Sequence, residues 1–298
     1  MAITGTGIPT NTTNIQLPNE VSAEILQKAQ ESSIVMQLAR QIALPGRGAQ
    51  IPIIAGDPEP AWVSETGAKP VSNPTLDKKI MQAHKLAVIV PFSDEFRRDA
   101  AALYDALIAR LPGVLSKKFD NTVFFGPTSG TLANFDNLSA VTQYALDTTG
   151  KTAYDGLVAA DVAISTLGGT VTGYAMSPQG RGVLLSAVDG DKRPLFVNSA
   201  ADGAPDRLLG APVHFTAAAY KAGAASTPDI VGFAGDWTKA MYGVVQGVKI
   251  DYSADATLVN GNQTINLFQQ NMFAVRAEIE IGFVAETEYF AALTRTAA

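Results

Sequence analysis

The chain has 298 residues, of which 47% are hydrophobic and 17% charged, with a formal net charge of −6 and no cysteine. This length and composition are those of a globular protein with one or two domains. The lack of cysteine excludes disulfides, thiolate catalysis and cysteine-bound zinc, and the lack of a strongly basic run argues against a sequence-specific nucleic-acid reader.

Residues 1–19 are rich in Thr, Asn and Gly without periodicity, which predicts an extended N-terminal arm. The segment lacks the basic region and apolar core of a signal peptide. The longest aliphatic runs, about seven residues, are far shorter than a membrane span. Asn19 is predicted to cap a helix whose apolar residues recur at helical spacing as far as Ile42, and Pro45-Gly46 ends it.

The next segment, residues 57–91, is the most unusual in the chain. It follows a short strand over 50–54, where Pro52 indicates a sheet edge. As one strand, Thr75 to Val90 would be ~50 Å long, and between positions 76 and 85 neither face is consistently apolar. A two-stranded ribbon without a buried face is marginal in water. We therefore expect residues 57–85 to form an extended loop that lies on another copy of the chain.

The strongest helix is predicted over about 93–124, with Ser93 as its cap and two acidic residues in its first turn. Pro112-Gly113 should kink or break it. Beyond residue 130 the pattern changes to alternating helices and strands. Asp155 is expected to cap a helix that ends at Gly168-Gly169, and Asn260-Gly261 predicts a hairpin. Further strands are predicted over 171–176, 230–234, 240–245 and 248–252, with strand or mixed structure over 271–281 and 283–290.

No group of residues predicts catalysis. The two histidines, His84 and His214, have no nucleophile motif beside them, and His84 is expected on the extended loop in contact with water. Gly150-Lys151-Thr152 lacks the earlier glycine of a phosphate-binding loop, and Asp189-x-Asp191 lacks the later residues of a calcium loop. We expect a non-enzymatic protein without cofactor or metal.

Several side chains on the extended loop and the long helix are candidates for contacts between subunits. They either form a solvated face or pair with groups on a neighbouring copy, where charges would set the register of the contact more than its affinity. The candidates are Trp62, Glu65, Lys69, Asp77, Lys78, Lys79, Arg97 and Arg98.

The order of short motifs over residues 18–295 resembles the major capsid protein of tailed phages with the Hong Kong 97-type fold. Trp62-Val-Ser-Glu65 resembles that family's extended loop, and Phe92-Ser-Asp-Glu95 with Arg98-Asp99 the start of its spine helix. Tyr174-Ala-Met-Ser-Pro178 and Leu208-Leu-Gly-Ala-Pro-Val213 resemble its axial domain. Gly235-Asp236-Trp237 and Ala285-Glu-Thr-Glu-Tyr-Phe290 resemble its late strands and closing segment.

The resemblance implies an α+β fold with four parts. These are the N-terminal arm (1–19), the extended β-hairpin loop (57–85), a peripheral domain that contains the spine helix (20–56, 86–131 and 243–298) and an α/β axial domain (132–242). Copies would form hexamers and pentamers of an icosahedral shell around double-stranded DNA, without sequence-specific DNA binding. Deleting Glu59 to Lys85 should then leave the subunit folded and block assembly.

The same resemblance implies a portal protein as partner. A scaffolding protein, if needed, would be separate, because only a short tail precedes the first predicted helix. The location would be the virion, assembled in the cytoplasm of a host bacterium. Some family members cross-link their shells through a loop lysine. Lys69, Lys78 and Lys79 are available, but no motif matches the asparagine and glutamate partners, so mature particles should run as monomers on denaturing gels.

Two alternatives remain open from the sequence. An encapsulin-like bacterial nanocompartment shares the fold but holds cargo enzymes. A cytosolic enzyme with an unrecognised site would instead be a monomer or a small oligomer.

Overall fold

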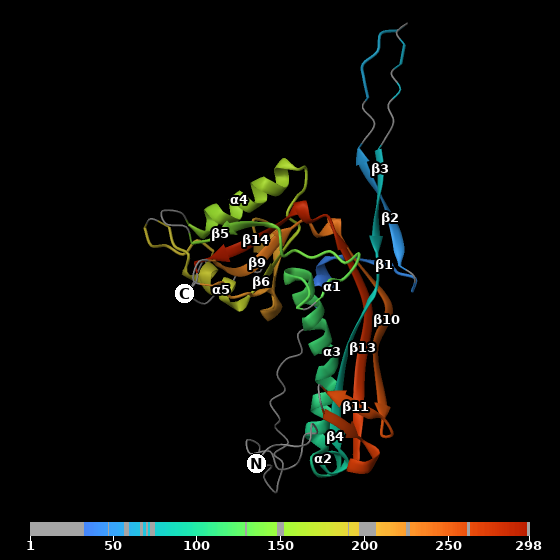
Figure 1. Cartoon of the computed structure of the whole chain (residues 1–298). Helices are drawn as coiled ribbons and strands as arrows, with labels where there is room; N and C mark the ends of the chain where they lie inside the picture. Colours follow the sequence, from blue (N-terminus) through green and yellow to red (C-terminus); the bar gives the residue numbers. More distant parts are fainter. Residues whose placement is uncertain are drawn as a thin grey trace.

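The computed structural model describes residues 33–46, 48–56, 60–65, 68–69, 71, 75–128, 130–147, 152–189, 191–196, 207–224, 227–260 and 263–296. The predicted N-terminal arm and the expected helix start at Asn19 lie outside these residues. The described chain forms two large sheets joined along a long helix, with a small two-stranded sheet on the body and a thin two-stranded arm that projects away from both large sheets (Figure 1).

The first described helix ends earlier than predicted. Helix α1 covers Ile34–Leu38 and begins at Ser33, whose Oγ accepts a hydrogen bond from the Met36 N–H. The expected helix as far as Ile42 is wrong over its last turn, because Arg40–Ala43 forms strand β1. This strand pairs in parallel with Met241–Val244. Pairing with a distant strand therefore overrides the local helical periodicity at this point.

A four-stranded sheet in the order β1-β10-β13-β4 forms the long side of the body. Its long strands are β10 (Ala240–Ser253), β13 (Met272–Ala285) and β4 (His84–Ser93). Strand β10 is continuous where two strands were predicted, and the predicted gap falls at register shifts between Val244 and Lys249. On β4, Leu86, Val88 and Val90 pack on the main core.

The predicted long helix exists but divides at a different residue. Helix α2 covers Asp94–Asp99 and α3 covers Ala101–Phe125, with the break at Ala100 (φ −133°, ψ 48°). The sequence predicted a kink or a break at Pro112, and a break is wrong, since α3 runs through this residue. The buried residues Leu111, Leu115, Phe119 and Val123 recur every four positions, so packing of this face keeps the helix intact across the proline. The Ser93 cap is confirmed, with its Oγ 3.1 Å from the Phe96 nitrogen.

The second sheet has six strands in the order β5-β14-β9-β6-β8-β7. They are β5 (Thr142–Ala145), β14 (Phe290–Arg295), β9 (Asp229–Gly235), β6 (Gly173–Met176), β8 (Ala211–Phe215) and β7 (Arg207–Leu208). Residues 290–295, which the sequence grouped with 243–298, thus lie in a sheet built mostly from residues 132–242. The domain boundaries themselves stay a prediction.

Two helices pack against this sheet, α4 (Ala153–Thr166) and α5 (Pro178–Ser186). The cap of α4 is Thr152, and the predicted cap Asp155 is the third residue of the helix. Its Oδ2 accepts from the Thr152 N–H at 2.7 Å, which completes a capping box. The pattern therefore located the helix start but assigned the wrong member of the pair as cap.

The remaining elements are short. The predicted hairpin around Asn260 is confirmed by the antiparallel strands β11 (Thr257–Asn260) and β12 (Gln263–Asn266). Single 3-10 turns lie at η1 (Ala217–Ala219), η2 (Trp237–Lys239), η3 (Phe268–Gln270) and η4 (Thr287–Tyr289). Phe124 of α3 stacks on Phe233 of β9 at 4.8 Å between ring centroids, which joins the long helix to the six-stranded sheet.

The hairpin arm consists of β2 (Ala49–Gly56), β3 (Thr75–Met81) and the residues between them. The two strands pair antiparallel with each other and project from the body (Figure 1). The expected single strand over 75–90 is wrong. It is two strands separated at Gln82 and Ala83, because β4 leaves the arm to join β13 of the four-stranded sheet.

Candidate functional site

The predicted contact residues lie on the hairpin arm and on α2, and the outer part of the arm and α2 are at opposite ends of the molecule (Figure 1). Trp62, Glu65 and Lys69 lie on the outer part of the hairpin arm, and all three are exposed. The Trp62 side chain is 104% exposed, so it makes no packing contact with its own subunit. Lys78 is exposed on β3, and the side chain of Asp77 lies outside the described residues.

Arg97 and Arg98 form the second group, on α2. The Arg97 guanidinium lies 4.9 Å from the centre of the Phe273 ring and 3.5 Å from Asp94. Arg98 donates to Asp99 at 2.8 Å, and this hydrogen bond lowers the pKa of Asp99. Both arginines stay exposed to solvent. Their contact with a neighbouring subunit stays a prediction.

Lys79 has an internal role that the sequence did not reveal. Its Nζ donates to the Ala285 carbonyl at 2.6 Å and to Asp136 Oδ2 at 3.2 Å. The same carboxylate oxygen accepts from the Ala285 N–H at 3.0 Å. These bonds connect β3, the end of β13 and the loop before β5, so Lys79 fixes the base of the hairpin arm to the body.

Loop 133–136 holds the base of the hairpin arm at two further points. The Gln82 N–H donates to the Asn134 carbonyl at 3.3 Å, and His84 Nε2 lies 2.8 Å from the Ala133 carbonyl. The expectation that His84 lies in open water is wrong. It begins β4 opposite Ile281 and is half-buried, with its ring edge-on to Phe135.

The base of the arm also has a small core, which corrects the expectation that residues 76–85 have no buried face. Met81 is fully buried against Leu44 and Val284. Glycines on the body allow this close approach: a Cβ on Gly282 would lie 2.8 Å from the Gln82 carbonyl oxygen. The arm is therefore anchored at its base and uncovered farther out.

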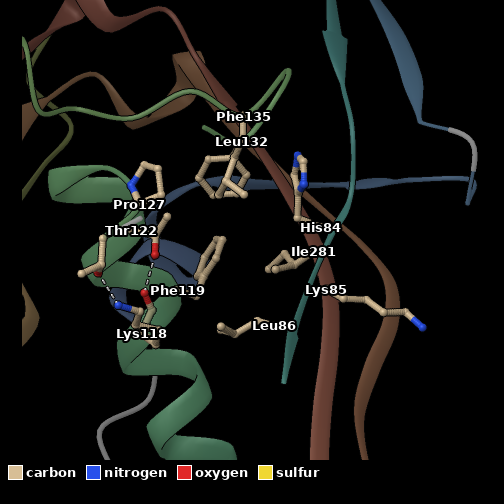
Figure 2. Close-up of a pocket in the computed structure, with 11 residues that line it drawn as sticks. His84, Lys85, Leu86, Lys118, Phe119, Thr122, Pro127, Leu132, Phe135 and Ile281 are labelled. Carbon is tan, nitrogen blue, oxygen red and sulfur yellow. Dashed lines mark hydrogen bonds between the residues drawn. The ribbon is translucent and has the colours of Figure 1, made fainter. Parts of the chain in front are cut away.

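Beside this base lies a cavity of about 340 Å³ between β4, α3 and residues 127–135 (Figure 2). Its lining residues are His84, Lys85, Leu86, Lys118, Phe119, Thr122, Pro127, Thr128, Leu132, Phe135 and Ile281. Lys118 Nζ donates to Thr128 Oγ1 at 2.6 Å across the rim. Since these residues come from four separate segments, no sequence motif could have indicated the cavity.

Within the described residues no cluster of three or more His, Asp or Glu could hold a metal ion. Asp189 Oδ1 accepts from the N–H groups of Asp191 and Arg193, as in a turn. Gly150-Lys151 lies outside the described residues. Among the helices that the structure describes, none combines the length and apolar character needed to cross a membrane.

Residues 14–294 match the model of the phage capsid family. The chain belongs to the phage capsid family. It is 26% identical over 291 residues to the "probable major capsid protein" of Mycobacterium phage D29, covering 93% of this chain and 89% of that protein. It is 27% identical over 290 residues to the "major capsid protein" of Staphylococcus phage 80alpha, covering 93% and 84%.

Solved structures with the same fold come from several phages. A chain from Gordonia phage Cozz matches with a TM-score of 0.77 at 23% identity, covering 95% of this chain and 92% of that one. A chain from Mycobacterium phage Adephagia gives 0.75 at 22%, covering 93% and 94%. The capsid of an empty GTA particle gives 0.68 at 16%, covering 93% and 95%. The expected Hong Kong 97-type fold is confirmed.

Proposed function

We propose that this chain is the major capsid protein of a tailed phage and that its copies form the hexamers and pentamers of an icosahedral shell. The observation that carries this proposal is the family match over residues 14–294, on a subunit whose hairpin arm projects an uncovered tryptophan. On a member of a family of shell proteins, such an uncovered side chain is a candidate for contact with another molecule. In a homo-oligomer that molecule is a second copy of the chain.

The division of the subunit suits this task. The two sheets and α3 share one core, which gives each copy a fixed shape. The base of the hairpin arm is held by Lys79, Met81 and the bonds to loop 133–136. The outer part of the arm contacts a neighbouring subunit. Because the base sets the direction of the arm, one subunit can reach a neighbour at a defined angle.

The proposal includes the contents and partners of the shell. The shell encloses double-stranded DNA without reading its sequence, in keeping with a net charge of −6 and no strongly basic run. A portal protein is a partner of the shell, and scaffolding, if assembly needs it, comes from a separate protein. Assembly takes place in the cytoplasm of the host bacterium, and the protein has no catalytic role. An encapsulin shell is not favoured, since the compared relatives are phage capsid proteins.

Electron microscopy of negatively stained particles tests the proposal. The full chain is expressed in bacteria together with the genes that flank its own, and the sedimenting fraction is imaged. We expect closed shells on the order of hundreds of Å across, far larger than any small oligomer. Their subunits should run as monomers on a denaturing gel. A chain found only as a monomer or small oligomer contradicts the proposal, and shells filled with a cargo enzyme favour the encapsulin reading instead.

A further inference from the structure

The cavity beside the base of the hairpin arm has the character of a site for an aromatic side chain. Its walls are mainly apolar, formed by Leu86, Phe119, Leu132, Phe135 and Ile281. Its volume of about 340 Å³ lies within the range of small-molecule pockets. The ionised side chains in its lining are cations only, Lys85 and Lys118. A suitable occupant is therefore aromatic and carries negative charge nearby.

The outer part of the hairpin arm has the complementary character. Trp62 is 104% exposed and Val71 is 90% exposed. The sequence from 57 to 71 carries three acidic residues, Asp57, Glu59 and Glu65, against the single lysine Lys69. Tryptophan is enriched among the residues that dominate protein interfaces, where it fills a desolvated pocket. An uncovered tryptophan on an acidic segment is thus what the cavity would accept.

The arm of one subunit cannot reach its own cavity. The cavity begins at His84, immediately after the end of β3. Strand β3 extends the arm by about 23 Å from this point, and Trp62 comes after Gly56, which pairs with Thr75 at the outer end of that strand. The pairing of β2 with β3 keeps the ribbon straight, as Figure 1 shows. The tip and the cavity therefore lie far apart in one chain, and a contact between them needs two copies.

We propose that Trp62 of one subunit inserts into the cavity between β4 and α3 of a neighbouring subunit, with Glu65 close to Lys85 or Lys118. This deepens the proposed function and rests on it. The contact is heterologous, because the tip of one copy meets the arm base of the next, and such contacts close into rings when the rotation permits. Each inserted tip then lies against His84 and Phe135 of the receiving subunit. These residues are at the base of that subunit's own arm, so the tip also packs against the base that sets the direction of the next arm.

The absence of cysteine allows a direct test by site-specific disulfides. Thr128 is an exposed residue on the cavity rim, so a chain with Trp62→Cys and Thr128→Cys places one thiol at the tip and one at the cavity. In oxidised particles we expect a ladder of several linked chains that reductant removes. Either single variant can give at most dimers. The control pair Trp62→Cys with Val162→Cys, an exposed position on α4, should give no ladder.

A second measurement covers the case in which loss of Trp62 prevents assembly. A photoreactive benzoylphenylalanine replaces Val63, which is 40% exposed, so that Trp62 stays in place. After irradiation of particles, we expect cross-links to residues 84–86 or 118–135 of another copy. Cross-links from the tip to other surfaces, or a cavity occupied by residues 1–32, overturn the inference while particles still support the proposed function. If the wild-type chain forms no particles at all, the proposed function itself fails.

Discussion

The carboxylate of Asp229 holds together three segments at one end of the six-stranded sheet. It is 4% exposed at the start of β9. Its Oδ1 accepts from the Gly223 N–H at 2.8 Å. Its Oδ2 accepts from the Tyr220 hydroxyl at 3.1 Å and from Arg295 Nη2 at 3.0 Å. The carboxylate thereby joins β9 to the loop before it and to the end of β14.

This arrangement predicts acid sensitivity. The hydrogen bond from the Gly223 N–H, followed by that from Arg295, lowers the pKa of Asp229 in the folded chain. A lowered pKa stabilises the fold above the ordinary pKa of aspartate, and this contribution is lost as pH falls below about 4. Asp229→Asn should therefore be less stable than wild type at pH 6 and lose less stability between pH 6 and pH 3.

Urea unfolding of the unassembled chain across that pH range measures the effect. Asp191→Asn is the matched control, because Asp191 is exposed and its ion pair with Arg193 is long, at 3.9 Å. The control should follow the wild-type profile. Equal pH slopes for wild type and Asp229→Asn would contradict this role for the carboxylate.

At the scale of elements, the base of the hairpin arm depends on glycines that let backbone approach backbone. A Cβ on Gly282 of β13 would lie 2.8 Å from the Gln82 carbonyl oxygen and 2.9 Å from Met81 Cγ. A Cβ on Gly243 of β10 would lie 2.6 Å from Leu44 Cβ. Strands β10 and β13 therefore approach Met81 and Leu44 this closely only because glycine stands at positions 243 and 282.

Gly282→Ala should destabilise the subunit by about 1–3 kcal/mol, the usual cost of forcing an extra group into a packed core. The matched control is Gly182→Ala on α5, where an added Cβ meets nothing within 4 Å. That control should be neutral or stabilising by up to about 1 kcal/mol, because alanine favours a helix over glycine. Chemical unfolding of both variants checks the difference, and an equal effect at the two sites would show that the close approach is unimportant.

At the scale of the whole molecule, the hairpin arm has an anchored part and an uncovered part. The role of the arm in assembly must therefore be tested by a deletion that spares the anchored part. Removing residues 59–85 would take away Lys79 and Met81 and begin to remove β4. Leu44 and Val284 would then lose their cover. The expectation that the rest stays folded after that deletion therefore no longer follows.

A shorter replacement separates assembly from folding. Gly56 pairs with Thr75, so replacing residues 57–74 with Asn-Gly closes the ribbon with a two-residue hairpin turn. We expect this variant to fold with wild-type stability, because it keeps Lys79 and Met81, and to form no shells. Sedimentation and electron microscopy measure assembly, and urea unfolding measures stability. Normal shells from the shortened chain would show that the arm tip is dispensable.

Much of the local structure could be predicted from sequence because its causes are local. Ser93 followed by Asp94 and Glu95 defines a helix start through hydrogen bonding and the helix dipole alone. Asn260 at the end of β11 marks a hairpin through backbone preference. The long apolar stripe of α3 and the order of motifs indicated the fold class. The exposed Trp62 followed from an arm segment whose pattern gave it no buried face.

The tertiary structure decided what depends on distant partners. Ile42 is in a strand because β10 lies beside it, and Pro112 stays within a helix because the residues around it are buried on one face. Lys79 is an internal anchor only because Asp136 and Ala285 meet there. The cavity arises where four segments converge. The sequence by itself determined that this chain has a projecting arm. Packing between residues far apart in the chain determined where that arm is held and which surface remains for another subunit.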